Sequence, residues 1–566
     1  MQKKQNAILL AFGSAVLLSG CGKLGNLSAD NFKVTPTPLE AVAGQVPATI
    51  SVTFPEKYMK KKAQVTCIPV LRYENGQTEG VSATFQGEKI EGNATSVNYK
   101  VGGVYNMKTN FRYTDDMLRS DLVMTFDAKV GKKAKKVKPV TIGYGVLATS
   151  QLLGRCLDTS NPAVAPDNYQ RVIKQKQEAS IKFLIGQSTL RTSELTSVSV
   201  KDLVNILREI NDDQEGRMLE KLEVSAYASP DGKYSFNEKL AERRQDVSAD
   251  YMKKELKKLR MNADINTRYT AEDWEGFQEL IQASNLQDKQ VILSVLSMYK
   301  DPEEREQQIR NMSEVYTDIK DGILPELRRA RLIVNYEVIG RSDEQIIEQF
   351  KQDAGQLSVE ELNYGATMLM ENMADKKAWN EKTTQLFPND YRAYNNLAAL
   401  AYQRGDYEEA ARQLKKAKNV NNSAAEANVN LALLALREGK VEDAETLLAQ
   451  GAAANTYTQT MGLVNLAKGN YHQASAQLEG ANTNAQALAE ILDKDYQNAA
   501  ATLSTITRTD ATTSYLKAIL AARQNDATTM AANLKNAAQQ DNTLANRAKR
   551  DLEFAQYADK GASLLK

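Results

Sequence analysis

The sequence is poor in the residues on which most enzymes depend. Histidine occurs once in 566 residues, as His472, which lies in a stretch with helical periodicity. A single histidine placed there argues against Ser-His-Asp and Cys-His catalysis and against a histidine-based metal site. The chain has neither a P-loop nor a G-x-G-x-x-G turn. We therefore expect no enzymatic activity, no cofactor and no metal, and we expect His472 at the surface near a helix start.

Cysteine is scarce as well, with three in the whole chain. Cys67 and Cys156 form an even pair downstream of Cys21, and an even pair in an oxidising compartment suggests a disulfide. The alternative is two thiols buried separately. Two cysteines are too few for a four-ligand zinc site.

Net charge is close to zero, and long apolar runs are confined to the N-terminus. The net charge of +1 argues against nucleic acid as a partner. Lys3 and Lys4 precede the apolar run that begins at Ala7–Phe12, and small residues precede Cys21. This order is typical of a secretory signal over residues 1–20, too short for a membrane span.

The segment Leu18-Ser19-Gly20-Cys21 resembles a bacterial lipobox, in which the cysteine is acylated (palmitate is one such acyl group) and becomes the first mature residue. The alternative is an ordinary signal peptide with an incidental cysteine. Residues 22–25 carry no acidic tract of the kind that usually directs lipoproteins to the cell surface. We expect an anchor in outer-membrane lipid, facing the periplasm.

The next region is β-rich. Residues 21–45, which contain Pro36 and Pro38, suggest an extended leader from the anchor. Residues 46–160 hold runs such as Ile50–Phe54, rich in branched and aromatic side chains, and an Asn75-Gly76 hairpin turn. These features predict a small antiparallel β-sandwich.

A strand end, a turn and a helix over Tyr227–Tyr251 resemble the OmpA-like peptidoglycan-binding family. The family signature N-x-x-L-S-x-x-R-A is matched here by Asn237, Leu240, Ala241, Arg244 and Gln245. The resemblance implies an α+β domain over residues 165–340, with a helical insertion at 270–323 like those of Bacteroidota-type lipoproteins. The arginine-rich run before Leu332 resembles the closing strand of the family.

The resemblance implies a site for the diaminopimelate residue of the cell-wall stem peptide. Arg244 would meet a ligand carboxylate, which suits the planar donor fork of arginine, and Asn237 would lie at the pocket edge. Ser229 occupies the position of the family aspartate, and the nearest acid is Asp231. Asp231 could bind the ligand ammonium or only stabilise its proline–glycine turn. Arg244 could alternatively be an ordinary exposed helix residue, or it could pair with Glu242 or Glu238.

The C-terminal part is repetitive. Gly405 and Gly439 are 34 residues apart, which is the tetratricopeptide period. The matching positions are Gly405, Tyr407, Ala410, Leu414 and Ala417 in one copy, and Gly439, Val441, Ala444, Leu448 and Gly451 in the next. We predict repeats over 391–560, after a helical linker or degenerate repeat at 341–390. Their concave groove suits a peptide or protein segment.

The expected fold is multi-domain: a β-sandwich, an α+β OmpA-like domain and an α-helical tetratricopeptide-repeat solenoid. The expected function is that of an outer-membrane lipoprotein that binds peptidoglycan and scaffolds other envelope proteins through its repeats. The alternative is a docking subunit of outer-membrane secretion or barrel-assembly machinery in which the wall pocket is lost; Ser229 favours this alternative, whereas Asn237 and Arg244 favour the tether.

Overall fold

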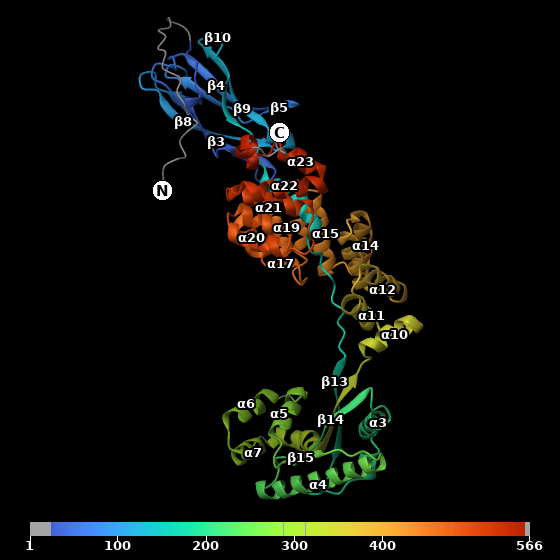
Figure 1. Ribbon diagram of the computed structural model, residues 1–566. Helices are drawn as coiled ribbons and strands as arrows, with labels where there is room; N and C mark the ends of the chain where they lie inside the picture. The colour runs from blue at the N-terminus through green and yellow to red at the C-terminus, as the bar shows by residue number, and fades with distance from the viewer. Residues whose placement is uncertain (1–23, 287, 312, 561–566) are drawn as a thin grey trace. The chain divides into compact units, whose positions relative to one another are not determined.

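The computed structural model describes residues 24–286, 288–311 and 313–560 (Figure 1). The chain forms two compact units. Unit 1 combines the chain up to Pro166 with the chain from Glu371 onward, and unit 2 is the intervening Asp167–Met370. Cys21, the predicted lipidation site, lies outside the described residues. No helix within the described ranges has both the length and the apolar character needed to cross a bilayer.

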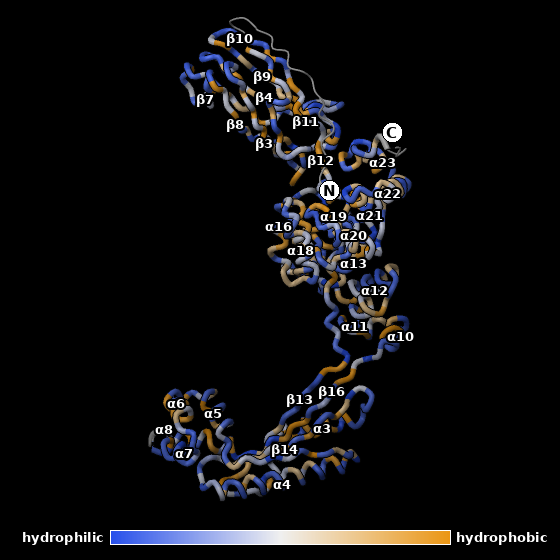
Figure 2. The backbone as a smooth tube through the Cα atoms, turned by 60° about the vertical axis from the view of Figure 1, so that its left-hand side comes forward, coloured by the Kyte–Doolittle hydropathy of each residue, from blue (hydrophilic) through white to orange (hydrophobic). Residues whose placement is uncertain are grey.

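The N-terminal part of unit 1 contains two larger sheets and one two-stranded sheet, packed on one hydrophobic cluster. The first contains β1 (Phe32–Thr35), β3 (Gln45–Phe54) and β8 (Gly103–Arg112). The larger one contains β4 (Ala63–Tyr73), β5 (Gly76–Glu79), β6 (Ala83–Gly87), β7 (Thr95–Val97), β9 (Ser120–Val130), β10 (Lys133–Lys135) and β11 (Val140–Tyr144). Burial alternates along β3, which turns its apolar side chains inward, and the mixed hydropathy of these strands is visible in Figure 2.

The predicted extended leader is wrong over much of its length. Val34 in β1 pairs with Ile50 in β3, and β2 (Leu39–Glu40) pairs with β12 (Val146–Leu147). The physical reason is that Val34 and Leu39 are apolar and are buried in the cluster between the sheets.

The C-terminal part of unit 1 is a stack of helix pairs of the tetratricopeptide type. The first helices of the pairs are α13 (Tyr391–Gln403), α15 (Ala425–Arg437), α17 (Tyr457–Ala467), α19 (Asn484–Leu492) and α21 (Ala511–Arg523). The second helices are α14 (Tyr407–Val420), α16 (Val441–Leu448), α18 (Tyr471–Leu478), α20 (Tyr496–Thr505) and α22 (Ala527–Gln540). Helix α12 (Met373–Leu386) precedes this array, and α23 (Asn542–Ala548) and a short 3-10 segment (Leu552–Lys560) follow it.

Local sequence accounts for these pairs. Gly405 has φ +78° and follows α13, so the chain turns at a conformation that glycine adopts without strain. Asp406 then caps α14 by accepting a hydrogen bond from the Glu409 N–H, a contact typically worth about 1 kcal/mol. Ala410 and Leu414 are buried where the helices cross.

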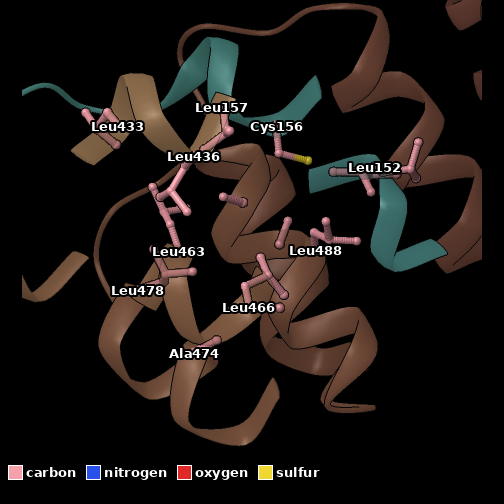
Figure 3. Packing of buried hydrophobic residues seen from close by; sticks show 14 of the residues in the cluster. Leu152, Cys156, Leu157, Leu433, Leu436, Leu463, Leu466, Ala474, Leu478 and Leu488 are labelled. Atoms are coloured by element: carbon pink, nitrogen blue, oxygen red, sulfur yellow. The ribbon is translucent and has the colours of Figure 1, made fainter. Parts of the chain in front are cut away.

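A short irregular segment leaves the β region and joins the array. It contains a 3-10 turn (Thr149–Leu152), α1 (Leu153–Cys156) and a second 3-10 turn (Leu157–Thr159). Cys156 and Leu157 are buried in the hydrophobic cluster of the array (Figure 3). The last strand of the β region therefore ends at Leu147, short of the boundary expected at residue 160.

The disulfide predicted between Cys67 and Cys156 is wrong. Both residues are free thiols. Cys67 is buried between the two sheets, whereas Cys156 is buried among the helices of the array. Each thiol is therefore held in a different hydrophobic cluster, as the alternative expected.

Unit 2 is built on a four-stranded sheet of order β13-β16-β14-β15. Its strands are β13 (Val172–Lys182), β14 (Arg217–Tyr227), β15 (Ile265–Thr270) and β16 (Arg329–Ile339). Strand β16 runs antiparallel to β13 and β14, and β15 runs parallel to β14. Helices α3 (Val198–Asp212) and α4 (Tyr234–Lys258) contribute to the same hydrophobic cluster as these strands. Helices α10 (Asp343–Asp353) and α11 (Val359–Tyr364) follow β16, and Ser358 and Glu361 form a capping box at the start of α11.

The helical segment predicted between the signature helix and β16 is present. It contains α5 (Trp274–Ala283), α6 (Lys289–Met298), α7 (Pro302–Asn311), α8 (Ser313–Asp318), a π-helical turn (Ile319–Ile323) and α9 (Leu324–Leu327). These helices bury a cluster of their own, which includes Phe277, Ile281 and Ile292.

Candidate functional site

The candidate site lies where strand β14 ends. The loop Ser229–Gly232 leads from β14 to α4. The four candidate site residues lie on this loop (Ser229 and Asp231) or on α4 (Asn237 and Arg244). Because β14 and β16 are antiparallel and Ala226 pairs with Ala330, the residue two positions before Ala330 lies beside this loop. That residue is Arg328.

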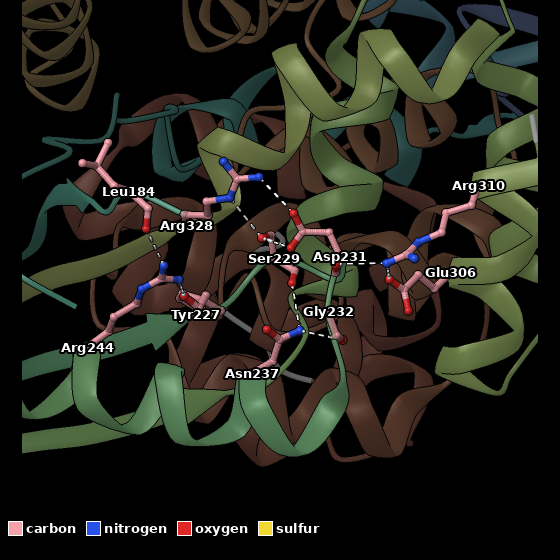
Figure 4. A network of polar contacts seen from close by, with 10 residues as sticks. All are labelled: Leu184, Tyr227, Ser229, Asp231, Gly232, Asn237, Arg244, Glu306, Arg310 and Arg328. Carbon is pink, nitrogen blue, oxygen red and sulfur yellow. Dashed lines mark hydrogen bonds and ion pairs between the residues drawn. The ribbon is translucent and has the colours of Figure 1, made fainter. Parts of the chain in front are cut away.

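The central contact of the site is an ion pair between Arg328 and Asp231 (Figure 4). Arg328 Nη2 donates to Asp231 Oδ2 at 3.0 Å, and Arg328 Nε donates to Ser229 Oγ at 3.2 Å. Ser229 Oγ in turn donates to Asp231 Oδ1 at 2.5 Å. The Arg328 and Asp231 side chains are 11% and 15% exposed, so the pair is largely buried and still reaches solvent.

The turn-stabilising role considered for Asp231 is visible in this loop. Its main-chain N–H donates to the Ser229 carbonyl at 2.8 Å, which closes the turn. Its carboxylate also accepts the Ser229 hydroxyl within the loop, and its other oxygen pairs with Arg328. Arg328 was not predicted as a site residue, although it opens the arginine-rich run at the start of β16. The run is visible in the sequence, but only the register of β16 against β14 places Arg328 beside the loop.

Asn237 holds the loop from the first turn of α4. Its Nδ2 donates to the Ser229 and Gly232 carbonyls, each at 3.1 Å. The side chain is 3% exposed. Asn237 therefore fixes the loop conformation and, in this structure, presents no free amide hydrogen at the surface of the site.

Arg244 differs from expectation. It lies seven residues after Asn237 and therefore on the same helix face, but it is buried and donates to three main-chain carbonyls. Nε reaches Gln187 at 3.0 Å, Nη1 reaches Tyr227 at 2.9 Å and Nη2 reaches Leu184 at 3.1 Å. The guanidinium donors that were expected to bind a ligand carboxylate therefore connect α4 to the chain at the ends of β13 and β14. Neither Glu238 nor Glu242 is among the described partners of Arg244.

The charge of Arg244 still acts on the site. Burial, assisted by the positive charge of Arg328 and opposed by Asp231, lowers the pKa of Arg244 to about 10. Arg244 therefore stays a cation at neutral pH. Two guanidinium groups and one carboxylate leave the site with an excess of positive charge.

The helical insertion contacts the loop from the other side. Arg310 of α7 donates to the Asp231 carbonyl at 3.0 Å and pairs with Glu306 one turn earlier. Pro230 lines a cavity of about 10 Å³ together with Phe277 and Ile309, which has room for a single water at most. The insertion therefore covers the Pro230 side of the loop.

The chemistry available at this site is binding of charged groups. The described residues contain no cluster of three or more histidine, cysteine or acidic side chains able to hold a metal. The lone histidine, His472, lies at the start of α18 with its side chain 93% exposed and Nδ1 3.0 Å from Asp493, at the surface as expected.

No protein-family model matches the chain, and no curated protein matches it. Solved structures of repeat proteins do. A tetratricopeptide repeat protein from Parabacteroides merdae is 14% identical, over 44% of this chain and 99% of that one, with a TM-score of 0.27. PilF of Pseudomonas aeruginosa is 17% identical over 39% and 100%, with a TM-score of 0.26. Yeast Tom70 is 13% identical over 64% and 88%, with a TM-score of 0.23. At these TM-scores the repeat architecture rests on the helix pairs of the chain itself.

Proposed function

We propose that this chain is a lipoprotein anchored in the outer membrane through Cys21, facing the periplasm, that binds peptidoglycan through unit 2 and holds envelope proteins through its repeat array. The lipobox-like N-terminus supports the anchor. The OmpA-like signature on α4 supports the wall ligand. Stacked helix pairs are surfaces that commonly take protein segments, which supports the scaffold.

The ion pair of Asp231 and Arg328 carries the proposal for unit 2. A diaminopimelate residue presents an ammonium and a carboxylate on one carbon, and this pair offers the complementary charges side by side, 3.0 Å apart. Asp231 would take the ammonium, and Arg328 would take the carboxylate through its donor fork. The ligand would replace the internal pair with two new ones.

The other signature residues take supporting roles in this arrangement. Ser229 stands where the family has aspartate, and its hydroxyl donates to the carboxylate of Asp231 two residues on. Asn237 fixes the loop, and the buried charge of Arg244 favours an anionic group above it. Asp231 thereby supplies the acid that Ser229 lacks.

A second candidate function is supported by a separate observation. Three donors of Arg244 are used by main-chain carbonyls, and Arg310 of the insertion holds the loop from outside. A site closed in this way suits a docking subunit of outer-membrane secretion or barrel-assembly machinery, in which unit 2 binds protein and little or no peptidoglycan.

Co-sedimentation with purified peptidoglycan separates the two functions. The whole mature chain, made soluble by Cys21→Ser, should sediment with the wall, and free diaminopimelate should release it. Asp231→Asn and Arg328→Gln should each weaken binding about 10- to 100-fold, since a charged hydrogen bond contributes about 1.5–3 kcal/mol.

Arg208→Gln is the matched control, because Arg208 is an exposed arginine of unit 2 that donates a hydrogen bond to Asn205 on its own helix. It should leave sedimentation unchanged. A wild-type chain that stays in the supernatant would exclude wall binding and favour the docking subunit. For the anchor, Cys21→Ser expressed in the native cell should move the protein from the membrane fraction to the soluble periplasmic fraction.

A further inference from the structure

The repeat array of unit 1 already holds a segment of its own chain, which consists of a 3-10 turn (Leu157–Thr159) and the irregular stretch that follows it to Ala165. Residues 157–165 lie against the first helices of the pairs, on a surface formed by α13, α15 and α19, which we call the first-helix face. Leu157, Ala163 and Ala165 are at most 1% exposed there. Figure 3 shows how Leu157 enters among the side chains of the array.

Three asparagines bind the main chain of this segment. Ala163 donates its N–H to Asn430 Oδ1 at 2.7 Å, and its carbonyl accepts from Asn430 Nδ2 at 2.8 Å and Asn395 Nδ2 at 3.0 Å. Asn396 Oδ1 accepts the Ala165 N–H at 2.8 Å. A side-chain amide carries a donor and an acceptor, so it can pair with a peptide group as a neighbouring strand does.

These asparagines lie on the inner faces of α13 and α15 and are buried. Asn395 is fully buried, and Asn396 and Asn430 are each 3% exposed. Asn430 also donates to Asn395 Oδ1 at 2.9 Å, which orients both amides toward the segment. Buried amides need partners, because an unpaired one costs about 1–3 kcal/mol. The resident segment supplies them.

An acidic residue marks the other end of the segment. The carboxylate of Asp158 accepts a hydrogen bond from Tyr407 at 2.8 Å and pairs with Arg437. The Arg437 guanidinium lies over the Tyr407 ring, 3.5 Å from its centre, so the two side chains form one corner that takes an anion. Tyr402 donates to the Leu157 carbonyl at 2.8 Å beside it.

Side-chain size completes the recognition. Ala163 and Ala165 point into the array, whereas Val164 between them is 39% exposed. This alternation is that of an extended chain. Both inward alanines are at most 1% exposed, so a much larger side chain at either position would collide with the helices of the array. The first-helix face therefore favours small residues at the positions of Ala163 and Ala165.

We propose that the first-helix face is a peptide-binding site whose resident ligand is the segment 157–165 of this chain, with the pattern Asp-x-x-x-x-Ala-x-Ala. A partner segment of the same chemistry binds there only when the resident segment has left. The expected free groove of the array is therefore occupied by the chain itself. The inference that a partner segment exists rests on the scaffold function proposed above. The inference that the resident segment occupies the first-helix face does not depend on that function.

The test uses the whole mature chain and a fluorescent synthetic peptide of residues 157–166. Ala163→Glu combined with Ala165→Glu should expel the resident segment and leave the first-helix face unaltered. This variant should bind the peptide at least tenfold more tightly than the wild type does. A peptide carrying the same two glutamates should not bind, which controls for non-specific adhesion.

Two results would overturn the proposal. Equal binding to wild type and variant would mean that the segment does not occupy the face. No binding to a variant that keeps its helical circular dichroism would mean that the face does not recognise this peptide. The assay contains no peptidoglycan and no envelope partner, so its outcome is independent of the wall-binding test.

Hydrogen exchange on the intact wild type keeps the proposal testable if the double variant does not fold. The Ala163 and Ala165 amides should exchange slowly, and Asn430→Ala should speed exchange at Ala163 at least tenfold. Asn422→Ala, an exposed asparagine in the loop before α15, is the matched control and should change neither amide. Fast exchange at both alanines in the wild type contradicts the proposal.

Discussion

Arg328 Nη2 lies 3.0 Å from Asp231 Oδ2, although 97 residues separate the two in the chain. The antiparallel pairing of β14 with β16 brings them together, because Arg328 directly precedes one strand and Asp231 follows the other. The two side chains form an ion pair with each other. Any ligand of this site must therefore compete with an internal ion pair, which favours a molecule that carries both charges.

Arg244→Ala should destabilise unit 2 by about 3 kcal/mol, because it leaves three main-chain carbonyls without their donors. Arg244→Lys should recover only part of this loss, since a single ammonium cannot reach three diverging carbonyls. Hydrogen exchange of β14 and α4 amides measures the change. Arg243→Ala, its exposed neighbour, should stay within about 0.5 kcal/mol. Unchanged stability of Arg244→Ala with lost wall binding would restore the direct ligand role expected from the signature.

Unit 2 should lose stability in acid through Glu178. The hydrogen bonds from Arg331 lower the pKa of Glu178 in the folded chain, so folding favours its charged form. This contribution is complete above the pKa of an unfolded glutamate, about 4.3, and disappears as the pH falls through the lower folded value.

The measurement is hydrogen exchange of β13 and β16 amides in wild type and Glu178→Gln. The wild type should be the more stable at about pH 6, and the difference should shrink toward about pH 3. Glu220→Gln is the control, since Glu220 pairs with the well-exposed Lys174 and an exposed pair contributes little. A difference in stability between wild type and Glu178→Gln that grows toward low pH would contradict a lowered pKa of Glu178 in the folded chain.

Cys67 and Cys156 should be unreactive free thiols in the native protein. Burial raises the pKa of Cys67 to about 12 and raises that of Cys156 as well, so almost no thiolate is present at neutral pH. An alkylating reagent should leave both unmodified in the folded chain. Both should react once the chain is unfolded without a reductant, and mass spectrometry would count them. A mass two hydrogens lower before alkylation would indicate a disulfide instead.

Glu553→Ala should destabilise the C-terminal end of the array by about 3–5 kcal/mol, because it leaves a buried arginine without its counter-ion. Arg523 Nη2 donates to Glu553 Oε1 at 2.6 Å, and the two side chains are 15% and 5% exposed. Thr149 also contacts Glu553, which links the end of the β region to this pair.

Thermal unfolding followed by circular dichroism measures this loss. Glu442→Ala, an exposed acid in α16, should change stability by about 0.5 kcal/mol or less. Replacing both Arg523 and Glu553 by leucine should cost less than Glu553→Ala alone, because no buried charge is then left unpaired. A larger cost for the double replacement would contradict this account.

Local features of the sequence were sufficient to predict the repeat array. The 34-residue spacing of Gly405 and Gly439 predicts helix pairs, and the structure has positive φ at both glycines. Such turns and caps depend on residues close together in the chain. The strand, turn and helix around Asn237 were predicted from the resemblance to the OmpA-like family, and its signature also consists of residues close together in the chain.

Contacts between distant residues were decided only by the tertiary structure. Sequence spacing could not show that Arg328 pairs with Asp231 or that Arg244 donates its hydrogen bonds to main-chain carbonyls. Nor could it show that Cys67 and Cys156 are buried in different hydrophobic clusters. It also could not show that residues 157–165 fill the first-helix face, although asparagines at core positions of α13 and α15 were a visible signal. The physical reason is that turns and helix pairs follow from neighbouring residues, whereas strand register and the burial of polar groups depend on the whole fold.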